Sequence, residues 1–143
     1  FIPDEGSIMA LKTTALSGID VRIILMGVPD HKITFWASLS YVEELLESGV
    51  RIYSYTKGIL HAKVLILGSE IGVVGSTNFD IRSFSLNFEI SAFIYDCNFA
   101  RRLEIDFQQD LADSKELTLE EYKLRPFSNR IKESSARLFS PLL

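Results

Sequence analysis

The sequence lacks most of the features that mark specialised classes of protein. A single cysteine, Cys97, leaves no pair for an internal disulfide and no thiolate cluster for a metal. No apolar run approaches the roughly 18 residues of a membrane-spanning helix, since the best runs, Ile23–Met26 and Val64–Leu67, are as short as strands. Neither a signal peptide nor an internal repeat nor a low-complexity segment is visible. These absences indicate an ordinary globular chain, and the single cysteine suits either a reducing compartment or an organism indifferent to oxidation.

An excess of positive charge is also missing. The chain has 15 Lys and Arg against 19 Asp and Glu, which gives a net charge of −4 and a pI of about 5.2. Because binding a polyphosphate backbone normally requires a basic face, nothing here indicates a nucleic-acid surface. The 143 residues are 47% apolar, which excludes intrinsic disorder and is enough for one compact domain.

The first half of the chain alternates between helical and strand patterns. Helical spacing predicts a helix over 4–16, and a β-rich run predicts a buried strand over 20–26. Residues 28–35, which include His31 and Lys32, are expected to form a loop. Ser40 and Glu43 resemble a capping box for a helix that ends before Gly49, and residues 50–55 alternate as a strand does.

The second half predicts a β-hairpin, another strand and further helices. Apolar segments over 59–67 and 71–75 flank a Gly-Ser-Glu turn, and a further strand is expected over 88–95. Helices are expected over 98–112 and from a second capping box at Thr118, with an interruption at Pro126. This order of elements describes an α/β sandwich.

Polar residues with chemical potential gather at one end of the predicted hairpin. His61 and Lys63 share a face of their strand and so present an imidazole beside an ammonium, as an anionic phosphate ester requires. Ser76 and Asn78 have the same spacing on the next strand. A turn centred on residues 68 and 69 sets His61 opposite Ser76, and a turn one residue longer sets it opposite Thr77. Each pair alone is more often a solvated strand end or a turn, but their joint spacing favours a site.

A carboxylate completes this group of residues. Glu89 opens the next predicted strand and is expected to reach the same end of the sheet. A carboxylate on the Nδ1 atom of an imidazole fixes its tautomer and orientation, as in hydrolase triads. Taken alone, Glu89 would be read as a surface charge.

Together these residues resemble the HKD motif region of the phospholipase D superfamily. The resemblance rests on H-A-K at 61–63, G-S-T-N at 75–78, D-I-R-S at 80–83 and L-N-F-E at 86–89. The wider sequence, to the closing L-F-S-P-L-L, is similar to the C-terminal catalytic half of bacterial cardiolipin synthases. The resemblance implies a phospholipase D-like α/β sandwich with one HKD module, in which a mixed sheet is flanked by helices. Residues 1–114 would form this catalytic core, and 115–143 a helical tail packed on it.

The resemblance implies a phosphatidyltransferase. Enzymes of the family place two HKD modules face to face; one histidine forms a phosphohistidine, and the other protonates the leaving group and then activates the acceptor hydroxyl. His61 matches one of these histidines, and we favour the general acid/base role for it. Lys63 and Asn78 match the phosphate binders, Ser76 lines the pocket, and Glu89 matches the carboxylate behind the histidine. In a cardiolipin synthase, two phosphatidylglycerol molecules are donor and acceptor, and glycerol leaves.

One position departs from the family motif H-x-K-x-x-x-x-D. Gly68 stands where the aspartate belongs, and no shift by one residue restores a carboxylate. In the predicted hairpin this position lies in the turn, far from His61. We therefore expect a weakened turn and an intact catalytic histidine.

The expected partners follow from the same resemblance. They are phosphatidylglycerol, the N-terminal HKD half and a membrane surface, with a homodimer of the fragment as an alternative assembly. No metal, cofactor or nucleic acid is expected. Because the chain opens on Phe1-Ile2-Pro3 without Met, we interpret it as a soluble, inactive fragment of a protein anchored in the bacterial cell membrane. His31 and Lys32 are candidates for headgroup contact, against a plain solvent-exposed loop. The locally basic tail over 115–143 is interpreted as a packed helix. The alternative is that it lies on an anionic membrane.

Two other functional readings remain open at this stage. One is a single-HKD phosphodiesterase or nuclease that completes its site as a homodimer, which the acidic pI disfavours. The other is a non-catalytic module that retains the motif as a relic. The joint presence of His61, Lys63, Asn78 and Glu89 disfavours this second reading.

Overall fold

The computed structural model describes residues 1–29 and 31–140 and has an α/β architecture. Asp30 of the predicted loop and residues 141–143 of the predicted tail lie outside the described residues. The helices are α1 (Glu5–Leu16), α2 (Lys32–Leu39), α3 (Val42–Glu47), α4 (Ile81–Ser85), α5 (Cys97–Ala112), α6 (Leu119–Lys123) and α7 (Phe127–Arg137). The strands are β1 (Arg22–Met26), β2 (Arg51–Tyr55), β3 (Val64–Leu67), β4 (Ile71–Gly75), β5 (Ser91–Tyr95) and β6 (Ser114–Leu117).

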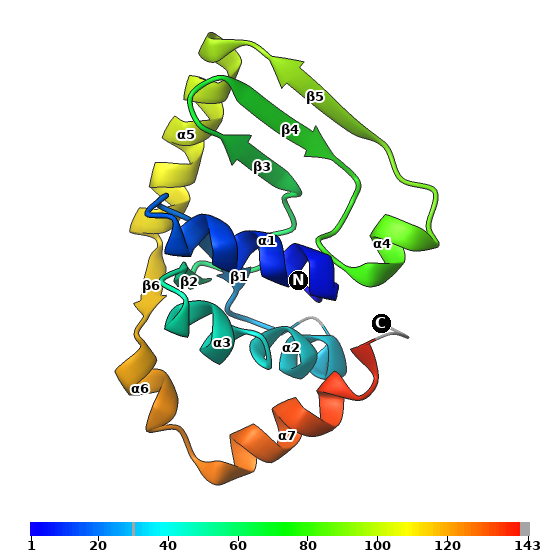
Figure 1. Ribbon diagram of the computed structural model, residues 1–143, viewed down its shortest axis with the longest axis vertical. Helices are drawn as coiled ribbons and strands as arrows, with labels where there is room; N and C mark the ends of the chain where they lie inside the picture. Colours follow the sequence, from blue (N-terminus) through cyan, green and yellow to red (C-terminus); the bar gives the residue numbers. More distant parts are fainter. Residues whose placement is uncertain (30, 141–143) are drawn as a thin grey trace.

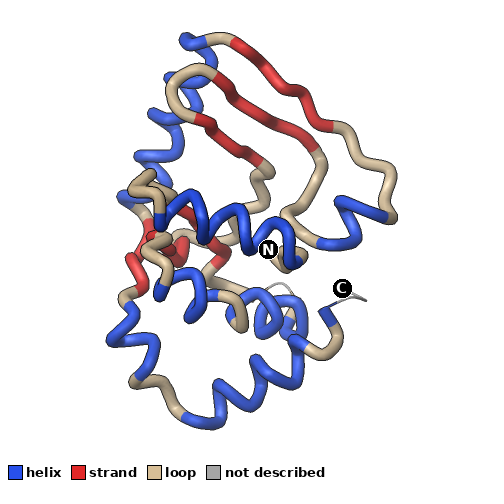
Figure 2. Tube along the Cα trace, in the orientation of Figure 1, coloured by secondary structure: helices blue, strands red, loops and turns tan. Residues whose placement is uncertain are grey.

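The strands of the described residues divide between two sheets (Figures 1 and 2). In the first, β2 lies between β1, which runs parallel to it, and β6, which runs antiparallel. In the second, β4 lies between β3 and β5, and both pairs are antiparallel. The predicted α/β class with mixed strand directions is confirmed. β6 was not expected, because residues 115–117 were assigned to a helical tail.

The long helix α5 connects the two sheets. It runs along both of them and contacts strands of each (Figure 1). On β4 the contact is closest at Gly72, where an added Cβ would lie 2.6 Å from Leu103 Cδ1 and 2.8 Å from the Phe99 ring. The opposite face of this sheet leaves Leu65, Phe93 and Tyr95 exposed. The strands of this second sheet are apolar on both faces. The described residues cover one of these faces and leave the other exposed.

The buried core surrounds the first sheet. Ile52 of β2 and Val50, which precedes that strand, belong to one buried cluster with Leu25 of β1 and with side chains from the helices α1, α2, α3, α6 and α7. The C-terminal helix α7 contributes Ala136 and packs along α2. Within the described residues no helix is both long and apolar enough to cross a bilayer.

Helix α1 shows how local sequence starts and stops an element. The Asp4 carboxylate accepts a hydrogen bond from the Ser7 N–H at 2.8 Å, so it caps the first turn. Gly18 follows the helix with φ of +89°, a conformation that side chains rarely adopt. The helix predicted over 4–16 is confirmed.

The loop predicted over 28–35 is wrong, because helix α2 begins at Lys32. The turn-forming residues of the segment 28–35 end at His31. The residues after it form a helix that buries Ala37 against the core. The capping box predicted at Ser40 is also wrong. The Ser40 hydroxyl donates to the Ala37 carbonyl at 2.6 Å, so it closes α2 while α3 begins without a side-chain cap.

A buried tyrosine joins the C-terminal segment to this core. The Tyr122 hydroxyl donates to the Leu39 carbonyl at 2.6 Å, and the Arg125 guanidinium stacks over its ring. Burial raises the pKa of Tyr122, so the hydroxyl stays protonated and able to donate.

Replacement of Tyr122 by Phe is expected to lower the free energy of unfolding by about 1–2 kcal/mol, because the Leu39 carbonyl loses its donor. Urea denaturation measures the loss. Tyr95→Phe is the matched control, since the Tyr95 side chain is exposed, and it should change little. Equal effects of the two substitutions would contradict the role given to this hydrogen bond.

The raised pKa of Tyr122 also predicts a pH dependence. Above a pH of about 10 an unfolded tyrosine releases its proton while the folded Tyr122 retains it, so unfolding releases a proton. Stability should therefore fall as the pH rises above this value. The fall should be steeper in the wild type than in Tyr122→Phe, measured by denaturation at pH 8–11. Parallel curves would contradict it.

Candidate functional site

His61 and Lys63 lie in the segment that leads into β3. The strand begins only at Val64. His61 and Lys63 therefore precede it, and the prediction that they form its first residues is wrong. The Lys63 ammonium donates to the His61 carbonyl at 3.0 Å, which folds the lysine side chain back along its own segment. The His61 side chain is exposed. The predicted pair therefore stays together at the entrance of the hairpin.

The pairing of β3 with β4 fixes which residues face His61. Val64 pairs with Val74 and Leu67 with Ile71, and the Gly75 N–H donates to the Lys63 carbonyl at 3.3 Å. Continuing this register places His61 opposite Thr77. The longer of the two predicted turns is the one observed, so the pairing of His61 with Ser76 is wrong by one residue.

Ser76 and Glu89 are in direct contact. The Ser76 hydroxyl donates to Glu89 Oε2, and it accepts a hydrogen bond from the Ile90 N–H at 3.1 Å. The Ser76 N–H donates to the Ile90 carbonyl at 2.9 Å. These bonds extend the β4–β5 pairing past its last ladder residues and hold the carboxylate beside the hairpin end that carries Lys63.

Glu89 lies in an extended segment before β5, since that strand begins at Ser91 and not at Phe88 as predicted. The side chains of this segment alternate. Asn87 and Glu89 turn toward the polar group, with 3.5 Å between Asn87 Nδ2 and Glu89 Oε1. Leu86, Phe88 and Ile90 are exposed. One short segment thus supplies both the carboxylate of the site and three exposed apolar side chains.

Some predicted site residues are not joined to this network. Across residues 1–29 and 31–140, Glu89 makes no hydrogen bond to His61, and the exposed Asn78 makes none with its side chain. His31 and Lys32 are exposed and lie on another element, at the start of α2. The contact of Glu89 with His61 and the headgroup role of His31 and Lys32 stay predictions.

Residues without an assigned role in the sequence also belong to the site. Ser83 and Asn87 approach Glu89 Oε1, and the Thr77 hydroxyl lies 2.8 Å from that of Ser91. A local signal was present for Ser83, because Asp80 precedes it by three residues and caps α4. The contact with Glu89 depends on how the chain returns from α4 toward β5, which spacing alone does not reveal.

Gly68 occupies the hairpin turn with φ of +58°, in the left-handed region, and an added Cβ would meet no atom within 4 Å. Gly68→Ala is expected to cost about 1 kcal/mol of stability, and Gly68→Asp less, because aspartate tolerates this conformation better. Thermal denaturation measures both. A stability gain in Gly68→Asp would instead show that the motif aspartate makes a favourable contact in this turn.

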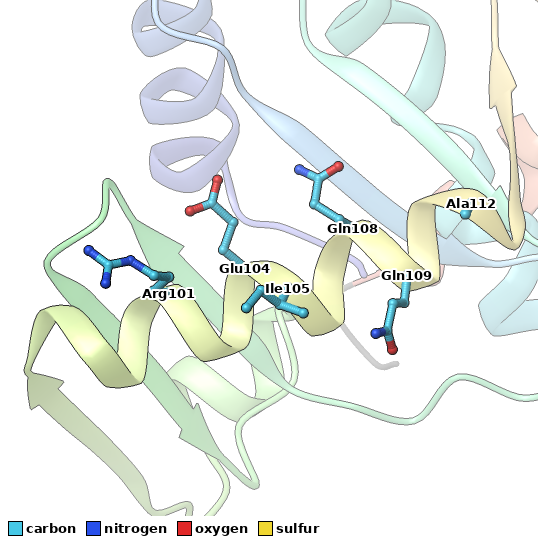
Figure 3. A pocket seen from close by; sticks show the side chains of 6 residues that line it. All are labelled: Arg101, Glu104, Ile105, Gln108, Gln109 and Ala112. Atoms are coloured by element: carbon cyan, nitrogen blue, oxygen red, sulfur yellow. The ribbon is translucent and has the colours of Figure 1, made fainter.

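Two surface hollows lie away from these residues. A shallow pocket of about 500 Å³ is lined only by side chains of α5 (Figure 3): Arg101, Glu104, Ile105, Gln108, Gln109 and Ala112. A second, of about 400 Å³, lies between α2, the first sheet and the C-terminal helices. Neither is lined by a predicted site residue. In the part of the chain that is described, no three His, Cys, Asp or Glu side chains gather as metal ligands.

Comparisons with known proteins agree with the motif. The family profile described as "Cardiolipin synthase, PLD-like domain" matches residues 1–111. The chain is 50% identical over its whole length to a cardiolipin synthase of Geobacillus sp. (strain WCH70), and 49% identical to the major cardiolipin synthase of Bacillus subtilis. It spans only 28% and 30% of these two relatives.

Two solved structures share the fold. Nuc from Salmonella typhimurium, a phospholipase D family member, superposes with a TM-score of 0.70 at 20% identity, over 82% of this chain and 76% of Nuc. The phosphatidylserine synthase of Haemophilus influenzae superposes with a TM-score of 0.69 at 15% identity, over the whole chain and 40% of that protein. The predicted phospholipase D-like fold is confirmed.

Proposed function

Because the chain belongs to the cardiolipin synthase family of phospholipase D-like domains, we propose that it is the C-terminal catalytic half of a phosphatidyltransferase. The observation that carries the proposal is the polar hairpin end. There, His61 and Lys63 lead into β3 beside the Ser76–Glu89 pair. The reaction is the transfer of a phosphatidyl group from one phosphatidylglycerol to another, with release of glycerol.

The proposed reaction has two displacements at phosphorus. A histidine from the other half attacks the donor phosphorus; an N–P bond forms, the P–O bond to glycerol breaks, and His61 gives the leaving oxygen its proton. His61 then takes the proton from the acceptor hydroxyl, which attacks phosphorus as the N–P bond breaks. His61 therefore ends protonated as it began, because the proton that left with glycerol is replaced by the proton of the acceptor hydroxyl, and the products are cardiolipin and glycerol.

The remaining residues bind and orient. The Lys63 ammonium and the Asn78 amide hold the non-bridging oxygens, where negative charge develops in the transition state. Ser76 lines the phosphate site. Glu89 orients His61, which requires a rearrangement from its present contact with Ser76 or a bridging group between the two side chains. Donors of this kind supply the charge stabilisation that a metal ion supplies in other phosphoryl transfers.

The half-site character of the chain predicts its behaviour in isolation. It offers one histidine of the required pair near the hairpin, because its second histidine, His31, lies on α2. We propose that the other half of the longer protein supplies the nucleophile, and that a membrane surface supplies the lipid. The chain alone should then have no synthase activity.

The test uses the longer protein that contains this chain, reconstituted with vesicles of phosphatidylglycerol. Cardiolipin and glycerol should appear in equal amounts, and quenching should trap an acid-labile, base-stable phosphoenzyme. Cardiolipin formation by the 143-residue chain alone would refute the half-site proposal. Hydrolysis of DNA by a dimer of this chain, with no lipid product, would replace the proposed function by that of a nuclease.

A further inference from the structure

Ser83 contacts Oε1 of Glu89, the carboxylate oxygen to which Ser76 does not donate. The side chain of Ser83 is among the few buried polar ones, with 6% of its residue surface exposed. Its hydroxyl lies 3.4 Å from Glu89 Oε1, while the Ser76 hydroxyl donates to Oε2. The carboxylate is therefore contacted at both oxygens by hydroxyl groups from different segments, the residue that follows β4 and helix α4.

Backbone contacts on both sides of Asp80 hold the segment that carries Ser83 in place. The Ser83 N–H donates to the Asp80 carboxylate at 2.7 Å, in the first turn of α4. Asp80 is tied to the start of the chain, because it forms a parallel bridge with the buried Ile2, whose N–H donates to the Phe79 carbonyl at 2.8 Å. The hydroxyl of Ser83 is thus presented to Glu89 from a fixed backbone.

We propose that Ser83 is a positioning residue for the Glu89 carboxylate. With Ser83 in place, the carboxylate has a donor at each oxygen and one preferred rotation about its terminal bond. Without it, Oε1 keeps only the Asn87 amide at 3.5 Å, and the carboxylate can turn away from the histidine side of the site. The catalytic consequence rests on the proposed function, whereas the contact itself does not.

A double-mutant cycle on the 143-residue chain tests the contact without any assay of activity. Ser83→Ala should lower the equilibrium constant for folding about fivefold, which is less than the loss of a short hydrogen bond to a carboxylate would give, because Ser83 Oγ and Glu89 Oε1 are 3.4 Å apart. In a Glu89→Ala background the same substitution should change it less than about twofold. Ser85→Ala, an exposed serine on the same helix, is the matched control and should be silent in both backgrounds. Equal losses in the two backgrounds would overturn the proposal.

Kinetics of the longer protein test the catalytic consequence. Ser83→Ala should lower kcat for cardiolipin formation about tenfold with KM unchanged, since the proposed role of Ser83 is to position Glu89 and not to bind the lipid. Ser83→Thr, which keeps the hydroxyl, should recover most of the rate. A wild-type kcat in Ser83→Ala would overturn the positioning role. If the cycle shows coupling but the wild-type protein makes no cardiolipin, the proposed function fails while the contact stands.

Discussion

Replacement of His61 by Ala in the longer protein is expected to reduce cardiolipin formation by about three orders of magnitude. His61 lies with Lys63 in the segment that leads into β3, and no other histidine lies on this hairpin. Loss of the proton donor leaves glycerol to depart as an alkoxide, which is a poor leaving group. Conversion of labelled phosphatidylglycerol measures the loss. Gln108→Ala, at an exposed position of α5, is the control and should keep the wild-type rate.

The same variant decides which role His61 has. With a p-nitrophenyl phosphodiester as donor, the leaving group needs no proton. If His61 is the general acid, His61→Ala should still form the phosphoenzyme from this donor at close to the wild-type rate. If His61 is the nucleophile, no phosphoenzyme forms from either donor. The second result would reverse the assignment favoured from the sequence.

Replacement of Gly75 by Ala is expected to disrupt the site through the backbone. Gly75 ends the central strand β4; its N–H donates to the Lys63 carbonyl, and it pairs with Ser91 of β5. An added Cβ would lie 2.3 Å from the Ile90 carbonyl oxygen and 2.7 Å from Ser91 Cα. Since these are backbone atoms, β5 must move away. We expect a loss of about 3 kcal/mol of stability.

The expected movement also separates Ser76 from Glu89, because the Ser76 N–H donates to the same Ile90 carbonyl. Urea denaturation measures the stability of the 143-residue chain, and the lipid assay of the longer protein measures the site. Gly6→Ala is the matched control, since its Cβ would meet no atom closer than 3.9 Å and alanine favours helix α1. An unchanged unfolding midpoint for Gly75→Ala would contradict the tight packing of β4 against β5.

The elements with strong local signals were predictable. α1 has its cap at Asp4, α5 has its cap at Asp96, and the hairpin of β3 and β4 has its turn glycine at position 68. Elements whose signals depend on distant packing were not. α2 is helical because Ala37 is buried against the core, and β6 is a strand because it pairs with β2. Short segments of this kind follow their tertiary neighbours more than their own propensities.

The sequence by itself determined the chemical groups of this protein and their grouping in pairs. The spacing of His61 with Lys63, and of Ser76 with Asn78, predicted that both pairs lie at one hairpin end, although the structure places them in the segments just outside β3 and β4. The motif that they form was enough to identify the family. Gly68 likewise marks the hairpin turn, where its φ of +58° favours glycine, whereas Gly72 and Gly75 lie where a close approach leaves no room for a side chain.

Only the tertiary structure decided which groups touch. The register of β3 with β4 sets Thr77, not Ser76, opposite His61, because the turn is one residue longer than its shortest form. The chain turns back through α4 and the segment before β5. This brings Ser76 and Ser83 to the two oxygens of Glu89. Hydrogen bonds of this kind depend on a few tenths of an ångström between elements distant in sequence, which the periodicity of single strands and helices does not specify.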